Sequence, residues 1–128
     1  MNGWPFQIVA DPTRSLLTIS FDSVLWTPDV AYRFRADCAA AVATLRCRPG
    51  EHLVLVDLRN AVLQSKEIYE KMQAFAASAT SRRIALVASA PLARMQSKRL
   101  QVRENIVLFA ELADAEAWLF QGDHMAAA

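Results

Sequence analysis

Three short and almost uninterrupted apolar runs constrain this chain more than any other feature of its sequence. They cover residues 53–58, 84–88 and 106–109, and stretches with helical periodicity separate them. Runs this short, bounded by turn signals, are typical of strands that are buried on both faces. Such strands belong to parallel sheets whose faces are covered by helices. The sequence therefore predicts an α/β fold with 53–58 as a central strand.

The amino-terminal part predicts a β-hairpin. Two β-rich runs, 6–10 and 15–21, are separated by Asp11-Pro12-Thr13-Arg14. Aspartate at the first position and proline at the second are what a type I turn prefers. We expect these two strands to pair antiparallel at one edge of the sheet.

Four helices are predicted between and after the strands. Thr27 supplies an N-cap for the first, which Pro49-Gly50 stops, and Ser65 supplies one for the second. Pro91 opens a third helix through about residue 101, and residues 112–120 form the fourth. The large side chains expected to point inward are Trp26, Phe34, Met72, Phe75, Met95 and Trp118.

The resulting element order is ββαβαβαβα. Strand-helix-strand units of this kind are connected by right-handed crossovers between parallel strands. The predicted architecture is a single mixed sheet with helices packed on it. A chain of 128 residues that is 54% hydrophobic suits one domain, which we assign to residues 1–122, followed by a flexible tail over 123–128.

The composition of the chain argues against some classes of binding partner. The net charge is +1, whereas nucleic acids and membrane surfaces usually bind strongly basic domains. No apolar stretch is long enough to span a membrane, and the amino terminus has no signal-peptide pattern. Cys38 and Cys47, nine positions apart in a predicted helix, cannot pair. We expect a cytoplasmic protein without nucleic-acid partners or stable membrane insertion.

The sequence carries no signature of a cofactor, a metal or a catalytic set. His52 and His124 do not combine with the two cysteines in metal-binding spacing. Three glycines in the whole chain do not form either of the glycine-rich loops that hold phosphates. We expect no cofactor and no metal, and we favour a non-enzymatic function over an enzymatic one.

The element order, the segment LVLVDLRNAVLQSKEIYEKM and the closing NIVLFAELADAEAWL resemble the STAS-like superfamily. That superfamily includes anti-sigma-factor antagonists and, more distantly, lipid-carrying CRAL-TRIO modules. The resemblance covers residues 6–120 and implies a regulatory domain that binds a protein partner. In the antagonists, a serine at the start of the helix after the Asp-ending strand is phosphorylated by a partner kinase.

Ser65 is the candidate for that regulatory serine, and Asp57 matches the strand end. A phosphate at a helix N-cap would meet free N–H groups and the positive end of the helix dipole. The family's Asp-Ser-Ser/Thr-Gly pattern is replaced here by Gln64-Ser65-Lys66-Glu67. We therefore favour the interpretation of Ser65 as an ordinary N-cap.

Two further groups are candidates for binding a ligand or partner. Asp57, Arg59 and Asn60 follow a parallel strand, where open α/β sheets place their ligands, although Asp-Leu-Arg-Asn is also a sequence that turns the chain. Arg94, Lys98 and Arg99, together with Arg82, Arg83 and Arg103, are suited to phospholipid headgroups or an acidic partner. The interpretation we favour for these cations is a solvated face partly neutralised by Glu111, Asp114 and Glu116.

Two functional hypotheses follow. The first is a regulatory interaction domain that presents its second and third helices to a partner protein, either as a single chain or as a homodimer. The second is a small apolar-ligand or lipid-binding protein with space between those helices and the sheet. Sequence does not distinguish a packed interior from a cavity for an acyl chain.

Overall fold

The computed structural model, which describes residues 3–121, places the predicted strands in one mixed sheet with the order β1-β2-β3-β4-β5. The strands are β1 (Phe6–Asp11), β2 (Leu16–Phe21), β3 (Leu53–Asp57), β4 (Arg83–Val87) and β5 (Ile106–Phe109). β1 and β2 are antiparallel, and all other neighbours are parallel. The predicted mixed sheet and its central strand are confirmed. The tail predicted for 123–128 lies outside the described residues.

The turn between β1 and β2 forms as its residue types predict. The Asp11 carboxylate accepts a hydrogen bond from the Thr13 backbone N–H at 3.1 Å and another from Arg14 Nε at 2.8 Å. Ser15 has a φ of 50°, in the left-handed region, so β2 begins one residue later than predicted. β1 extends to Asp11.

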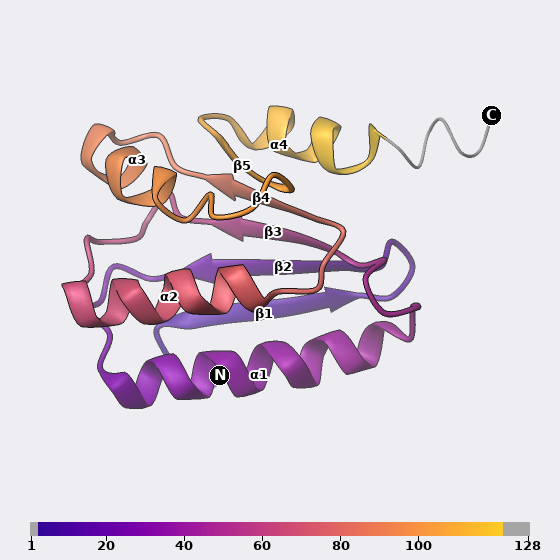
Figure 1. Ribbon diagram of the computed structural model, residues 1–128, viewed down its shortest axis with the longest axis horizontal. Helices are drawn as coiled ribbons and strands as arrows, with labels where there is room; N and C mark the ends of the chain where they lie inside the picture. The colour runs from indigo at the N-terminus through magenta and orange to yellow at the C-terminus, as the bar shows by residue number, and fades with distance from the viewer. Residues whose placement is uncertain (1–2, 122–128) are drawn as a thin grey trace.

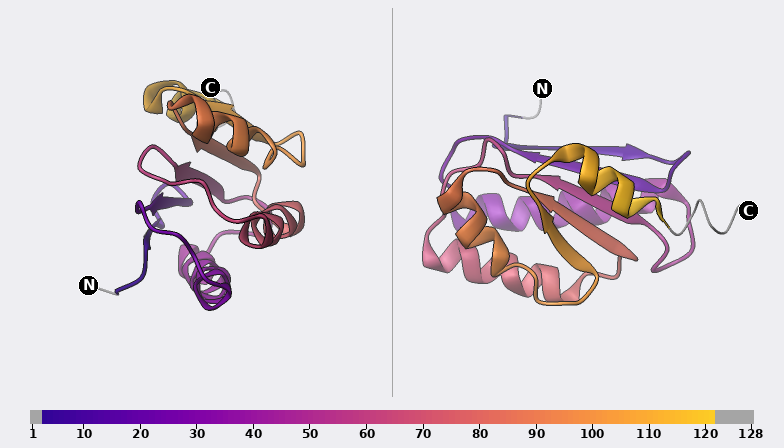
Figure 2. Two further views of the ribbon diagram at one scale, coloured as in Figure 1. Left: turned by 90° about the vertical axis from the view of Figure 1, so that its left-hand side faces the viewer. Right: turned by 90° about the horizontal axis from the view of Figure 1, so that it is seen from above.

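Helices α1 (Pro28–Leu45) and α2 (Lys66–Ser78) cover one face of the sheet, and α4 (Leu112–Leu119) packs on the opposite face. Helix α3 (Pro91–Lys98) lies beside β5. Figure 1 and Figure 2 show this layering, with α4 and the pair α1 and α2 on opposite sides of the strands. The side chain of Thr27 accepts a hydrogen bond from Val30 N at 3.4 Å and so caps α1, as predicted.

Alternate residues of the central strands contribute to two separate apolar layers. On the α1/α2 face, Val54 and Leu86 join the aromatic side chains Phe6, Trp26 and Phe34. On the α4 face, the main contributors are Leu16, Leu53, Leu55, Ala85, Val87, Ala115 and Leu119. The period-two alternation of a strand explains this division, because successive side chains point to opposite faces.

Helix α3 differs from its prediction in two respects. It ends at Lys98 instead of about residue 101, because the N–H groups of Arg99 and Leu100 bond three residues back and tighten the chain into a turn. Met95 was predicted to point inward, and this is wrong, because its side chain is 62% exposed. Ala93 and Ser97 face the interior, and Met95 is about 200° around the helix from each of them.

Candidate functional site

The carboxyl ends of β2, β3 and β4 meet at one edge of the sheet, on the left in Figure 1. Three connecting segments, 22–27, 58–65 and 88–90, lie at this carboxyl edge. They are joined by hydrogen bonds: Leu58 N donates to Val87 O at 2.8 Å, and Ser23 Oγ donates to Asn60 O. The structure therefore places segment 58–65, which holds the candidates Arg59, Asn60 and Ser65, against two other connecting segments.

Asp57 and Arg59 bind each other. Arg59 donates from Nε and from a terminal nitrogen to the two carboxylate oxygens of Asp57, at 2.9 and 2.8 Å, and its backbone N–H donates to the same group at 3.0 Å. The side-chain hydrogen bond from Arg59 lowers the pKa of Asp57 below its usual value, and the same bond raises the pKa of Arg59. These contacts turn the chain after β3, while Asn60 stays exposed.

Ser65 is the N-cap of α2, as predicted. Its Oγ accepts a hydrogen bond from Ile68 N at 3.3 Å, and the residue is exposed at the carboxyl edge. A plain cap of this kind stabilises a helix by about 1 kcal/mol. Phosphorylation of Ser65 stays a prediction.

Gln64 and Gln96 connect the segments of this edge, and the sequence did not point to either. The Gln64 side chain accepts from Trp26 N at 2.8 Å and donates to Val24 O at 3.1 Å. The Gln96 side chain completes the network, accepting from Gln64 N at 3.2 Å and donating to Gln64 O at 3.3 Å. Tyr69 Oη donates to Gln96 O, and burial raises the pKa of Tyr69 to about 12. These partners are far apart in sequence, so no local spacing signals them.

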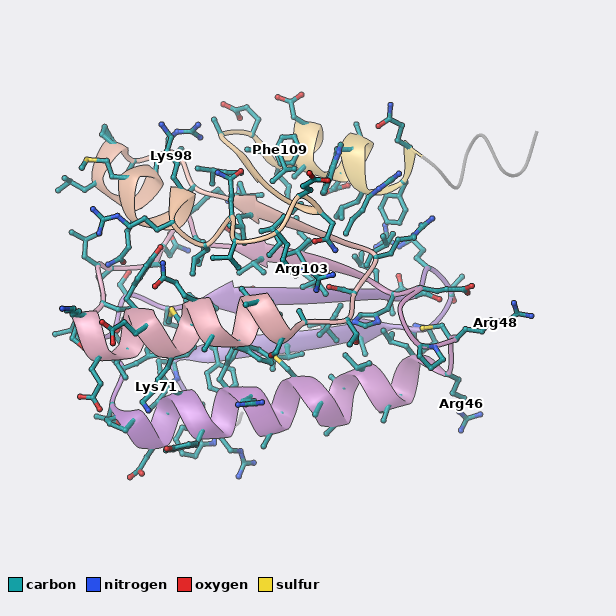
Figure 3. The ribbon with its side chains drawn as sticks, viewed as in Figure 1. Arg46, Arg48, Lys71, Lys98, Arg103 and Phe109 are labelled. Carbon is teal, nitrogen blue, oxygen red and sulfur yellow. The ribbon has the colours of Figure 1, made fainter. Side chains whose placement is uncertain are left out.

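The segments that this network joins carry exposed apolar side chains and exposed cations. We define the edge surface as Leu25, Leu63, Leu92, Met95, Lys98 and Arg99, all of them exposed. Gln64 follows Leu63 and is bonded to both Trp26 and Gln96, which places these segments side by side. Figure 3 shows Lys98 on α3 above this edge. Arg94 is half-buried and donates to Ala88 O at 2.9 Å, so it is partly committed to the fold.

Other arginines of the basic segment bond to backbone carbonyls instead of to acids. Arg83 donates to Trp118 O and Leu119 O at 3.0 and 3.1 Å, at the carboxyl end of α4. Arg103 donates to Ala79 O just past α2, toward which it points in Figure 3. Within residues 3–121, no ion pair joins either arginine to the acidic residues predicted to neutralise them. Cationic side chains are favourable partners for such terminal carbonyls.

A cavity of about 440 Å³ lies between α1, α2 and the sheet. Its walls are mostly aliphatic and aromatic, and they are formed by residues that include Leu17, Ile19, Phe34, Cys38, Val42, Val54, Met72, Phe75, Ala76, Ile84, Leu86 and Leu100. Burial raises the pKa of the Cys38 thiol to about 12, so this cysteine behaves as an apolar wall residue. The volume is within the range of small-molecule sites.

The amino ends of β3 and β4 provide a polar end to this cavity. His52, Thr80 and Ser81 line it there. Burial lowers the pKa of His52, which favours its neutral form. Sequence had assigned no role to these residues.

The described part of the chain holds no group of three or more His, Cys, Asp or Glu side chains arranged to bind a metal ion. None of the helices within residues 3–121 has the length and apolar character needed to cross a membrane.

Solved structures with a similar architecture include the following two. An anti-sigma factor antagonist from Mycobacterium paratuberculosis superposes with a TM-score of 0.61 at 16% identity, over 89% of this chain and 93% of its own. An uncharacterised protein from the DUF3478 family with a SpoIIAA-like fold, from Shewanella loihica PV-4, superposes with a TM-score of 0.68 at 15% identity, over 93% of this chain and 97% of its own.

The chain has the STAS-like fold that its sequence resemblance implied. At these identities the likeness establishes the architecture, and the function has to be argued from the site. No protein-family model matches the sequence, and no curated protein matches it significantly.

Proposed function

We propose that this protein is a non-enzymatic regulatory domain of the cytoplasm that binds a partner protein through the edge surface. The observation that carries the proposal is that Gln64 and Gln96 fix three segments of chain so that Leu25, Leu63, Leu92 and Met95 stay exposed together. A rigid group of exposed apolar side chains is typical of an interaction site. Similarity of fold to an anti-sigma factor antagonist supports a regulatory role.

The chemistry of the edge surface specifies the partner. Lys98 and Arg99 are exposed beside the apolar side chains, and residues 71–103 contain no acidic residue. A complementary partner presents an apolar segment flanked by carboxylates, because opposite charges at the rim steer association and exclude wrong partners. We therefore expect binding to weaken as salt concentration rises.

The edge surface is tested with paired variants of the full chain. Leu92→Ser with Met95→Ser removes apolar contacts, and Lys98→Glu with Arg99→Glu reverses the charge. The matched control is Val9→Ser, which alters an equally exposed apolar residue on the distant edge strand β1. Proteins captured from the native host by each variant are quantified by mass spectrometry.

We expect a partner that the wild type and Val9→Ser capture equally and that both edge variants lose by at least tenfold. Capture by the edge variants at the wild-type level would contradict the proposal. Native mass spectrometry of the same samples reports whether a second copy of the chain is the partner, which decides the homodimer hypothesis.

We favour Ser65 as an ordinary N-cap, and it is also the candidate residue for regulation by phosphorylation, because it is exposed at the start of α2. A phosphate there would sit at the helix N-terminus and bring negative charge toward Lys98 and Arg99. The test is incubation of the protein with host lysate and ATP, followed by phosphopeptide mapping with Ser65→Ala as control. Phosphate at other positions only would rule out this regulation.

The second candidate function is binding of a small apolar ligand or lipid. The cavity of about 440 Å³ beneath α2 is the observation that favours it. We expect native mass spectrometry of the purified protein to show an additional mass that organic extraction removes. A bare chain after exposure to a mixture of medium-chain lipids would count against this function.

A further inference from the structure

One buried polar group inside the cavity has no hydrogen-bond partner within residues 3–121. Ser81 is 3% exposed, its Oγ is fully buried and unbonded, and it lines the cavity at the amino end of β4. An unsatisfied buried hydroxyl costs about 1–3 kcal/mol, so such groups call for a specific explanation. Because Oγ itself has no accessible surface, the side chain must rotate toward the cavity before a ligand atom can bond to it and remove this cost.

The segment that carries Ser81 is held in place by its backbone. Asn105 Nδ2 donates to Ser81 O at 2.9 Å and to Arg82 O at 3.2 Å, and Arg82 N donates to His52 O at 2.8 Å. Ser81 and His52 therefore lie at the amino ends of the neighbouring strands β4 and β3, and both line the same end of the cavity. A ligand head at this end would lie beside His52, and rotation of the Ser81 side chain would bring its hydroxyl toward the head.

The charge of the lining indicates what kind of head fits there. Burial keeps His52 in its neutral form, so the polar end supplies hydrogen bonds without a positive charge. The permanent cation of the lining is Arg35, which is exposed on α1 with its guanidinium 5.9 Å from the Phe75 ring centre. Arg35 is the one Lys or Arg among the described lining residues, so a carboxylate head would be drawn to it, whereas a hydroxyl or amide head needs no counter-ion.

We infer that the cavity binds an uncharged single-chain amphiphile, with its hydroxyl or amide head at Ser81 and His52 and its tail among the apolar walls. This inference rests on the second candidate function and specifies its ligand. A cavity of about 150 Å³ holds benzene, so 440 Å³ corresponds to roughly eighteen non-hydrogen atoms at most. Medium-chain alcohols and amides fall within that limit.

The test compares three probes on the full chain by NMR titration: 1-octanol, octanoate and n-octane. We expect 1-octanol to bind most tightly and to shift the resonances of Ser81 and His52. Ser81→Ala should weaken 1-octanol binding about fivefold, equivalent to about 1 kcal/mol, and should leave n-octane binding unchanged. Ser78→Ala is the matched control, because Ser78 also lines the cavity but its hydroxyl already donates to Phe75 O at 2.9 Å.

The possible outcomes separate this inference from the function on which it rests. Equal binding of 1-octanol and n-octane, unaffected by Ser81→Ala, would leave an apolar-ligand protein and overturn the assignment of the head. Tighter binding of octanoate than of 1-octanol would also overturn it and would place the head at Arg35. If no probe binds the wild type, the apolar-ligand function itself fails. The comparison of the three probes on the wild-type protein needs no variant. It therefore tests the inference even if Ser81→Ala folds poorly.

Discussion

The two faces of the sheet are covered by helices in different ways. On the α4 face, a short helix places Ala115 and Leu119, both 0% exposed, directly against Leu55 and Val87 of the sheet. On the α1/α2 face, longer helices leave a cavity, and the buried residues of α2 are confined to Ile68 and Tyr69 near its start. The length of a helix therefore does not determine how tightly it packs on a face of the sheet.

Polar contacts hold α2 to the segments beside it. Near its start, Tyr69 donates to Gln96 O, and in its middle Gln73 Nε2 donates to Arg99 O at 3.1 Å. Past its end, Arg103 donates to Ala79 O. Because these bonds fix the helix relative to α3 and the following loop, its middle does not have to fill the space above the sheet. A helix held by such polar contacts can cover a cavity.

The largest expected change in the free energy of unfolding comes from replacing one leucine on each face of the sheet. Leu55→Ala should lower the free energy of unfolding by about 3–4 kcal/mol, because it opens a void in the closed α4 layer. Leu86→Ala on the neighbouring strand should cost about 2 kcal/mol, since Leu86 already borders the cavity and has fewer contacts to lose. Urea denaturation of both variants measures the difference. Equal losses would mean that the two faces are equally well packed.

A substitution at the polar end of the cavity should change the free energy of unfolding by an intermediate amount, and in the opposite direction. Ser81→Ala should raise the free energy of unfolding of the ligand-free protein by about 1 kcal/mol, because it removes an unbonded buried hydroxyl. Ser78→Ala is again the control and should be neutral or slightly destabilising. A loss of stability in Ser81→Ala would show that the Ser81 hydroxyl forms a hydrogen bond within the fold. The buried polar groups of the α1/α2 face would then be more fully hydrogen-bonded.

The smallest expected effect concerns the turn that leads from β3 toward α2. The pKa of Asp57 is lowered in the folded state, so its ion pair stabilises the fold above the unfolded value of 3.8 and is lost as pH falls through the lower folded pKa. Asp57→Asn should therefore make stability less sensitive to acid below about pH 4. The change should stay below about 1 kcal/mol, since the two side chains are 22% and 44% exposed. Urea unfolding at pH 3 and pH 6 measures it.

Most of the architecture could be predicted because its signals are local. The apolar run before Asp57 predicted the central strand, the Pro12 turn predicted the hairpin, and hydroxyl caps at Thr27 and Ser65 located two helix starts. Each signal depends on neighbours within a few positions, which sequence displays directly. Met95 was placed wrongly because the apolar pattern of a short helix does not fix which side meets the sheet.

The candidate site could be predicted only in part. The position of Asp57, Arg59 and Ser65 at one edge follows from the parallel topology, and the structure confirms it. The bonding of Arg59 to Asp57, of Gln64 to Gln96 and of Arg103 to Ala79 depends on which side chains reach one another. Gln64 and Gln96 are 32 positions apart and Arg103 and Ala79 are 24 apart, so no local sequence pattern indicates either contact.

The sequence by itself determined the order of the elements, the mixed sheet and the central place of β3, because hydrophobic periodicity and turn chemistry act over short distances. Only the tertiary structure decided that α2 stands over a cavity with Ser81 unbonded at one end. It also decided that the carboxyl edge exposes a rigid apolar surface. Both features depend on the distance and the angle between the helices and the sheet. Long-range polar contacts determine that distance and angle.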